Sequence, residues 1–150
     1  MARSIRALIL LAITGCSLPE WDVPTLGSDA PGVMEAVASA IVYQSDQDHY
    51  GISIPGFDYW ATPQETWASG VGDCEDFALL ALYALKRDAG IVGQFVSVHT
   101  AEVALHSLVR ADDTDWEPQT GTAPAAGYTV LAVLSYWEAF DTMRHRRGAD

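Results

Sequence analysis

Apolar positions recur along the chain in blocks that glycine, proline and aspartate clusters separate. In the first block, Val33, Val37 and Ile41 have the spacing of a single helical face, and Pro31 suits a first-turn position. The pattern predicts a helix over residues 31–43 with one buried side.

The longest block, residues 77–85, is apolar on nearly every helical face. A helix of this kind is buried on all sides rather than lying at the surface. Asp73 suits the N-cap position, and Gly90 is a suitable stop after Ala89. We therefore predict a central helix that begins just after Asp73 and ends at about Ala89.

The second half of the chain favours strands. Residues 91–100 and 103–111 contain many β-branched and aromatic side chains, and residues 128–134 form a third apolar run. The intervening segment 112–127 holds two prolines and two glycines and is predicted to be a loop, and Ser135 is placed to cap a last short helix. Helices followed by antiparallel strands predict an α+β domain.

Composition narrows the class of protein. The chain has 150 residues, 49% of them hydrophobic and 19% charged, which is typical of one globular domain. Its formal net charge of -12 describes a surface that repels nucleic acid and anionic lipid. The charge suits a soluble enzyme, and it suits binding of a basic partner or of divalent cations.

The N-terminus has the pattern of a targeting segment. Arg3 and Arg6 precede an apolar run, residues 7–13, that is too short to span a bilayer. Residues 13–16, Ile-Thr-Gly-Cys, then resemble a bacterial lipobox, in which cleavage leaves Cys16 as the lipidated first residue. An ordinary signal peptide with an incidental cysteine is the alternative.

The lipobox divides the chain into three parts. Residues 1–15 are predicted to be a lipoprotein signal peptide, residues 16–30 a lipidated N-terminus with a tether, and residues 31–150 the domain. The anchor would hold the protein at the periplasmic side of a bacterial membrane. Ser17 is not the aspartate that retains lipoproteins at the inner membrane, which favours the outer membrane.

Cys74 is the most informative residue for chemistry. It stands at the predicted start of the central helix, where free N–H groups and the helix dipole favour a thiolate nucleophile. The adjacent carboxylates of Asp73, Glu75 and Asp76 oppose ionisation of the thiol unless a cation or an imidazolium offsets them. The alternative is a small buried cysteine with a packing role.

A cysteine nucleophile needs a base, and the chain has four histidines. His49 falls in a predicted loop and His145 in a basic tail, whereas His99 and His106 fall in the strand region. A strand packed on the helix would deliver either imidazole to Cys74. Spacing alone does not choose between His99 and His106.

The region before and around Cys74 resembles bacterial transglutaminase-like cysteine proteinases. The resemblance is carried by Tyr-Trp-Ala-Thr-Pro at 59–63, by Trp67, and by Gly-Val-Gly-Asp-Cys-Glu-Asp-Phe-Ala at 70–78. The likeness spans about residues 57–110. It is greatest to the periplasmic, calcium-dependent members that release adhesins by cutting near paired alanines. The resemblance implies a papain-like core in which the central helix starts at the cysteine and packs on a small antiparallel sheet.

The same resemblance implies the roles of four residues. Cys74 would be the nucleophile, and His106 the base. Asp73 and Glu75 would be ligands of Ca²⁺, which would also cancel the carboxylate charge beside the sulfur. The alternative for both acids is that they merely cap the helix and complement its dipole.

The family also carries a third catalytic residue, an aspartate on the strand after the histidine. In this chain that strand is predicted to be residues 128–134, which contain no carboxylate, and Ala132 stands near the expected place. Asp112, Asp113 or Asp115 in the preceding loop would be substitutes or simply solvated side chains. In enzymes of related chemistry, loss of the residue that orients the histidine lowers the catalytic rate by about 10⁴-fold.

Two functions follow from these patterns. The first is a lipid-anchored cysteine peptidase that cleaves cell-envelope proteins through a thioester. The second is a non-catalytic lipoprotein that binds a peptide or protein partner with the same fold. Acyl transfer to an amine instead of water is a variant of the first.

Overall fold

The computed structural model describes residues 17–54 and 57–147. The predicted signal peptide and Cys16 lie outside these ranges. None of the helices within them has the length and apolar character that crossing a bilayer requires.

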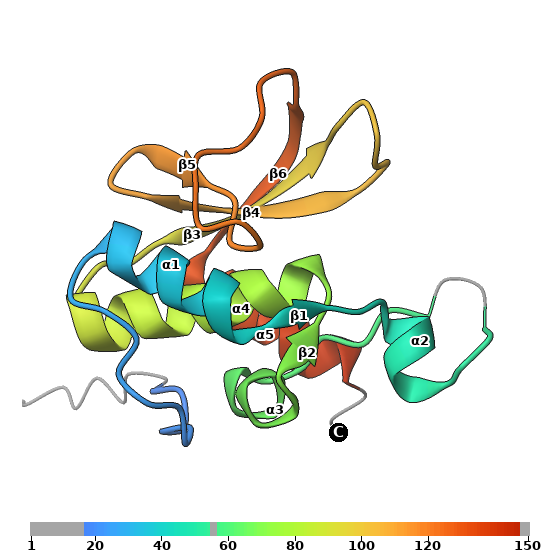
Figure 1. The fold of residues 1–150 in the computed structure, drawn as a ribbon, viewed down its shortest axis with the longest axis horizontal. Coiled ribbons are helices and arrows are strands. Elements are labelled where there is room, and N and C mark those ends of the chain that lie inside the picture. Colours follow the sequence, from blue (N-terminus) through green and yellow to red (C-terminus); the bar gives the residue numbers. More distant parts are fainter. Residues whose placement is uncertain (1–16, 55–56, 148–150) are drawn as a thin grey trace, which may run out of the picture.

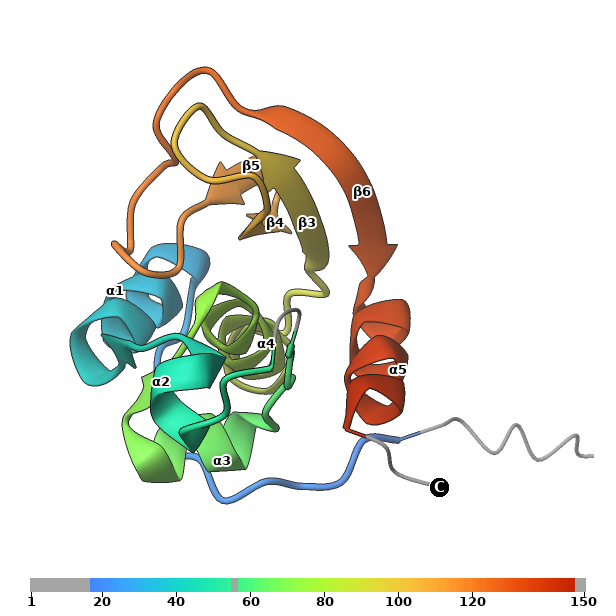
Figure 2. The same cartoon turned by 90° about the vertical axis from the view of Figure 1, so that its right-hand side faces the viewer.

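A four-stranded antiparallel sheet packs on a layer of helices (Figures 1 and 2). The strands are β3 (Gln94–His99), β4 (His106–Ala111), β5 (Thr114–Trp116) and β6 (Thr129–Ser135), in the order β5-β4-β3-β6. Three of them confirm the predicted strands: β3 and β4 begin three residues later than predicted, and β6 is displaced by one residue. The predicted loop 112–127 contains the fourth strand, β5, because Asp112 and Asp113 adopt positive φ and close a tight hairpin after β4.

Helix α4 (Cys74–Ala84) is the centre of the domain, as predicted, and continues into a π-helical turn, η1 (Leu85–Ala89). Every α4 residue from Glu75 onward is buried, and Phe77, Leu79 and Leu80 have no more than 1% of their surface exposed. Gly90 ends the helix with φ 71°, a left-handed conformation that suits glycine. Helices α1 (Ala30–Ala40) and α5 (Tyr136–Arg146) lie on either side of α4 (Figure 2).

Three short elements surround the start of α4. They are α2 (Asp46–Tyr50), α3 (Pro63–Ser69) and a parallel pair formed by β1 (Val42–Tyr43) and β2 (Val71–Gly72). The predicted first helix therefore ends earlier than residue 43. The N–H group of Val42 donates to the Gly70 carbonyl and that of Gln44 to Gly72, so the chain leaves the helix to pair with β2.

Residues 17–29, in the predicted tether, lie against the domain. The Trp21 ring packs on Tyr83 and Phe140 at centroid distances of 4.9 and 5.5 Å. The Arg87 guanidinium donates to the carbonyls of Val23 and Pro24 at 2.6 Å each. The chain thus enters the domain along the C-terminal half of the central helix.

Candidate functional site

Cys74 is the first residue of α4, and a turn from β2 delivers it there. The turn requires glycine at position 72, because a Cβ atom would lie 2.7 Å from the Asp76 Cβ. Asp73 is the N-cap, and the Asp76 side chain accepts from the Asp73 N–H at 3.4 Å and the Ala61 N–H at 2.8 Å. The chain approaching the cysteine is therefore fixed by backbone contacts.

Five carboxylates gather at this end of α4. Oxygen atoms of Asp46, Asp58 and Glu75 lie within 4.8 Å of one another, and so do those of Asp46, Asp73 and Asp76. Asp46 begins α2 and accepts from the Tyr59 N–H, which holds it against the turn. The two predicted ligands, Asp73 and Glu75, are therefore brought into one cluster.

Burial governs the protonation of this cluster. It raises the pKa of Asp73 to about 8, with the charges of Asp76 and Asp46 adding to the shift. It likewise raises the pKa of Asp76 to about 8 and that of Glu75 to about 10. Acids that keep protons near neutral pH mark an environment that lacks positive charge.

The cluster fits a hard divalent cation. Ca²⁺ takes six to eight oxygen ligands, mostly from carboxylates and carbonyls. The Oδ1 atom of Asp73 is buried and has no hydrogen-bond partner in the described residues, so it is free to ligate. Asp46 and Asp58 supply further oxygens beside Glu75. Asp46 carried no signal in the sequence, because α2 is a short helix in an irregular stretch.

The Cys74 thiol is held as a donor in this structure. Its sulfur donates to a Glu75 carboxylate oxygen at 3.0 Å. Burial raises the pKa of the thiol, the Glu75 charge raises it further, and the neighbouring Ser107 hydroxyl acts in the opposite direction. Without a cation, the carboxylates outweigh the helix terminus and the thiolate is disfavoured.

His106 is paired with a carboxylate that the sequence analysis missed. Its Nε2 atom contacts the Glu117 carboxylate, and Glu117 directly follows β5. The prediction that residues 128–134 are the strand after the histidine is wrong, because that run is β6 and the strand after the histidine is β5. Asp115 is not the substitute either, because Arg110 donates to its two oxygens at 2.6 and 2.9 Å.

The structure does not bring Cys74 and His106 together. Successive strand residues face opposite sides of a sheet, and the Ser107 side chain faces α4 beside the sulfur. His106 pairs with Val98 and lines, with Val98 and Leu108, a cavity of about 320 Å³ on the opposite face. Among the described residues no hydrogen bond joins Cys74 to a histidine, and His99 is exposed at the end of β3.

A family model and one solved structure agree on the fold. A family model described as "DUF553: Transglutaminase-like domain" matches residues 25–116. The structure of Legionella pneumophila LapG superposes with a TM-score of 0.54 at 17% identity, covering 79% of this chain and 78% of that one. The structure of a candidate cysteine protease from Cytophaga hutchinsonii superposes with a TM-score of 0.49 at 17% identity. The match covers 69% of this chain and 35% of that one. No curated protein matches the sequence.

Proposed function

Because the chain belongs to the DUF553 family of transglutaminase-like domains, we propose that it is a calcium-dependent cysteine peptidase with Cys74 as its nucleophile. One observation carries the proposal: the only cysteine in the described residues begins the central buried helix and donates to a carboxylate of a cation-fitting cluster. A packing cysteine would not need this polar setting.

The acid cluster and the thiol form one electrostatic unit. Asp73 and Glu75 would hold the ion, with Asp46 and Asp58 completing its oxygen shell. Bound Ca²⁺ supplies the positive charge that offsets the carboxylates beside the sulfur. Glu75 then no longer accepts from the thiol, so Cys74 gives up its proton more readily.

The base would be His106, with Glu117 as the carboxylate that orients it. Contact through Nε2 leaves Nδ1 as the nitrogen that accepts a proton from the thiol. The thiolate attacks a peptide carbonyl, His106 protonates the leaving amine, and water hydrolyses the thioester. For this reaction, the first residues of β4 must turn the imidazole toward α4. The adjacent Ser107 side chain already lies beside the sulfur there.

A second candidate function rests on the same geometry. His106 faces the cavity with Val98 and Leu108 and not the sulfur. A non-catalytic, cation-binding domain that holds a peptide or protein partner needs no movement of β4. The two candidates differ in whether Cys74 becomes reactive.

The surroundings of the protein are part of the proposal. The lipobox before Cys16 supports a lipid anchor on the periplasmic side of a membrane, the outer membrane more than the inner. Cell-envelope proteins would then be the substrates. The paired-alanine preference of the resembling proteinases supplies the first peptides to test.

Alkylation of Cys74 tests the proposal directly. In the chain that starts at Ser17, Cys74 is the only thiol. We expect Ca²⁺ to accelerate its reaction with iodoacetamide near neutral pH by at least about tenfold, one unit of thiol pKa. The rate is followed by intact-protein mass spectrometry.

Glu75→Gln is the matched variant for this experiment. It removes both a proposed ligand and the acceptor of the thiol proton, so its alkylation rate should no longer respond to Ca²⁺. A wild-type rate that is equal with Ca²⁺ and with a chelator would refute the calcium-activated nucleophile.

Substitution of the two strand histidines separates their roles. His106→Gln should lower kcat/KM for peptides with paired alanines by roughly 10²–10⁴, because it removes the proposed general base. His99→Gln is the control, since His99 is exposed at the end of β3, beyond the residues that pair with β4, and its substitution should leave the rate unchanged. Equal effects of both substitutions would remove His106 from the mechanism.

A further inference from the structure

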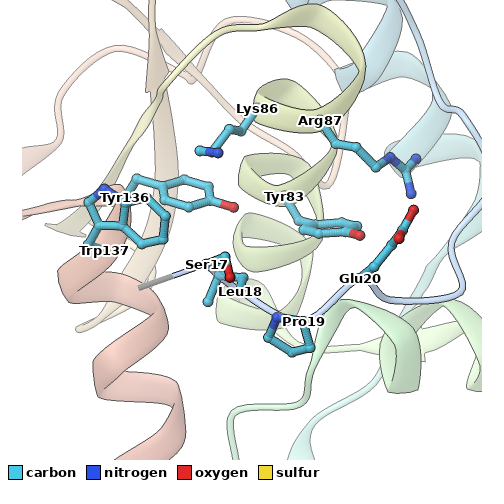
Figure 3. Close-up of a pocket in the computed structure, with 9 residues that line it drawn as sticks. All are labelled: Ser17, Leu18, Pro19, Glu20, Tyr83, Lys86, Arg87, Tyr136 and Trp137. Carbon is cyan, nitrogen blue, oxygen red and sulfur yellow. The ribbon is translucent and has the colours of Figure 1, made fainter. Parts of the chain in front are cut away.

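A pocket of about 410 Å³ lies where the described chain begins (Figure 3). Its lining combines the first described residues with aromatic and basic side chains: Ser17, Leu18, Pro19, Glu20, Tyr83, Lys86, Arg87, Tyr136 and Trp137. Tyr136 and Trp137 lie on one side and Tyr83 and Arg87 on the other (Figure 3). The residue that precedes this wall is Cys16, the predicted lipidation site.

Two side chains give this face its chemistry. Trp137 is 46% exposed at the start of α5. The chain's only lysine, Lys86, holds its ammonium 5.4 Å from the Trp137 ring and 5.5 Å from the Tyr136 ring. Tryptophan and tyrosine concentrate at membrane–water interfaces, and lysine places its charge among headgroups while its stem stays apolar.

Residues 17–21, which pack on the domain, keep the predicted anchor close to this face. The Trp21 N–H donates to the Tyr83 hydroxyl at 3.0 Å, and the Trp21 ring packs on Tyr83 and Phe140. Trp21 follows Cys16 by five positions in the chain, which span at most roughly 17 Å at about 3.5 Å per residue. An acyl chain on Cys16 would therefore begin next to Ser17, which lines the same pocket as Trp137.

We propose that the face formed by Trp137 and Lys86, with the buried Tyr136 ring behind them, rests on the bilayer interface when Cys16 carries the lipid anchor. This inference rests on the lipid anchor of the proposed function. The net charge of -12 opposes binding of the free domain, so the anchor supplies the effective concentration that lets this small face dock.

Docking on this face orients the site. Lys86 follows Cys74 by twelve residues along one continuous helix, α4 with η1, which is on the order of 18 Å. The cysteine end of the helix is then separated from the docked Lys86 by about this length.

Quenching by brominated lipid tests the docking. The chain from Cys16 with Cys74→Ser is coupled through its single thiol to a maleimide-headed lipid. The vesicles contain phosphatidylethanolamine, a minority of phosphatidylglycerol and chain-brominated lipid, and tryptophan fluorescence is recorded. We expect the brominated lipid to quench the wild-type fluorescence, and we expect this quenching to be at least about threefold smaller in Trp137→Phe. Trp116→Phe, a half-buried site packed on the core, should keep the quenching.

The outcomes separate the docking from the anchor. The chemical tether replaces acylation, so equal quenching in Trp137→Phe, or no quenching at all, overturns the docking face whatever happens in cells. Labelled palmitate incorporation into the full chain, with Cys16→Ala as control, tests the anchor alone. Loss of the anchor would leave a tethered docking result intact.

Discussion

Replacing Cys74 with alanine is expected to lower the rate of peptide cleavage by at least about 10⁴-fold, the scale of losing a nucleophile that acts as one unit with its base. The residue is proposed to form the thioester, and the chain from Ser17 offers no second thiol to replace it. Cleavage of peptides centred on paired alanines, in the presence of Ca²⁺ and read by mass spectrometry, measures the effect.

Ser107→Ala is the matched control for this substitution. The Ser107 hydroxyl lies beside the same sulfur and favours its ionisation, but it takes no part in bond making. Its loss should change the rate several-fold at most, and both variants should keep the melting temperature of the wild type. If the wild type cleaves these peptides and Cys74→Ala cleaves them equally well, the nucleophile is another group; if neither cleaves, the non-catalytic candidate is favoured.

The position of the cysteine was predictable because local and global signals coincide there. Asp73 caps the helix, residues 77–85 are apolar on all faces, and Gly90 stops it, so the sequence defines α4 without tertiary information. The family motif around Cys74 falls on the same boundary. Burial of a helix on all sides then places its N-terminus at the junction with the sheet.

The partner of His106 was not predictable in this way. β5 is three residues long, and the sequence of its hairpin turn, Asp112-Asp113, is typical of a loop. Only the pairing of Val109 with Trp116 shows that β5 extends to the residue before Glu117, which contacts the imidazole. The carboxylate proposed to orient His106 is therefore a glutamate on a short hairpin, whereas the resemblance predicts an aspartate on the strand after the histidine.

The side of the sheet that His106 occupies also escaped the sequence. In residues 106–111 both faces are apolar enough to be buried, so alternation does not say which side meets α4. A one-residue change of register would exchange His106 and Ser107. This is the physical reason that the catalytic proposal depends on a movement at the start of β4.

The metal-free protein is expected to lose stability as pH rises from about 4 to about 8, contrary to most acidic proteins. The folded pKa of Asp73 and of Asp76 is about 8, against about 3.9 in an unfolded chain. In this window the folded state binds protons that the unfolded state has released, so the free energy of unfolding decreases with pH. Glu65, whose pKa Arg147 lowers to about 2, affects stability only below this window.

Calcium should reverse this trend, because it needs the same carboxylates in their charged form. At about 100 times its dissociation constant, a ligand adds about 2.7 kcal/mol, which raises the melting temperature of a chain of this size by roughly 5–10 °C. We expect this rise at pH 8 and almost none at pH 5, in scanning calorimetry of the chain from Ser17.

Asp46→Asn distinguishes the cluster from general surface charge. Asp46 is common to both groups of acids that are close enough to share an ion, so its substitution should abolish most of the calcium effect at pH 8. Asp141→Asn removes an exposed carboxylate on α5 and should change nothing. A metal-free melting temperature that rises from pH 5 to pH 8 would contradict the protonated cluster. A calcium effect retained in Asp46→Asn would instead place the ion elsewhere.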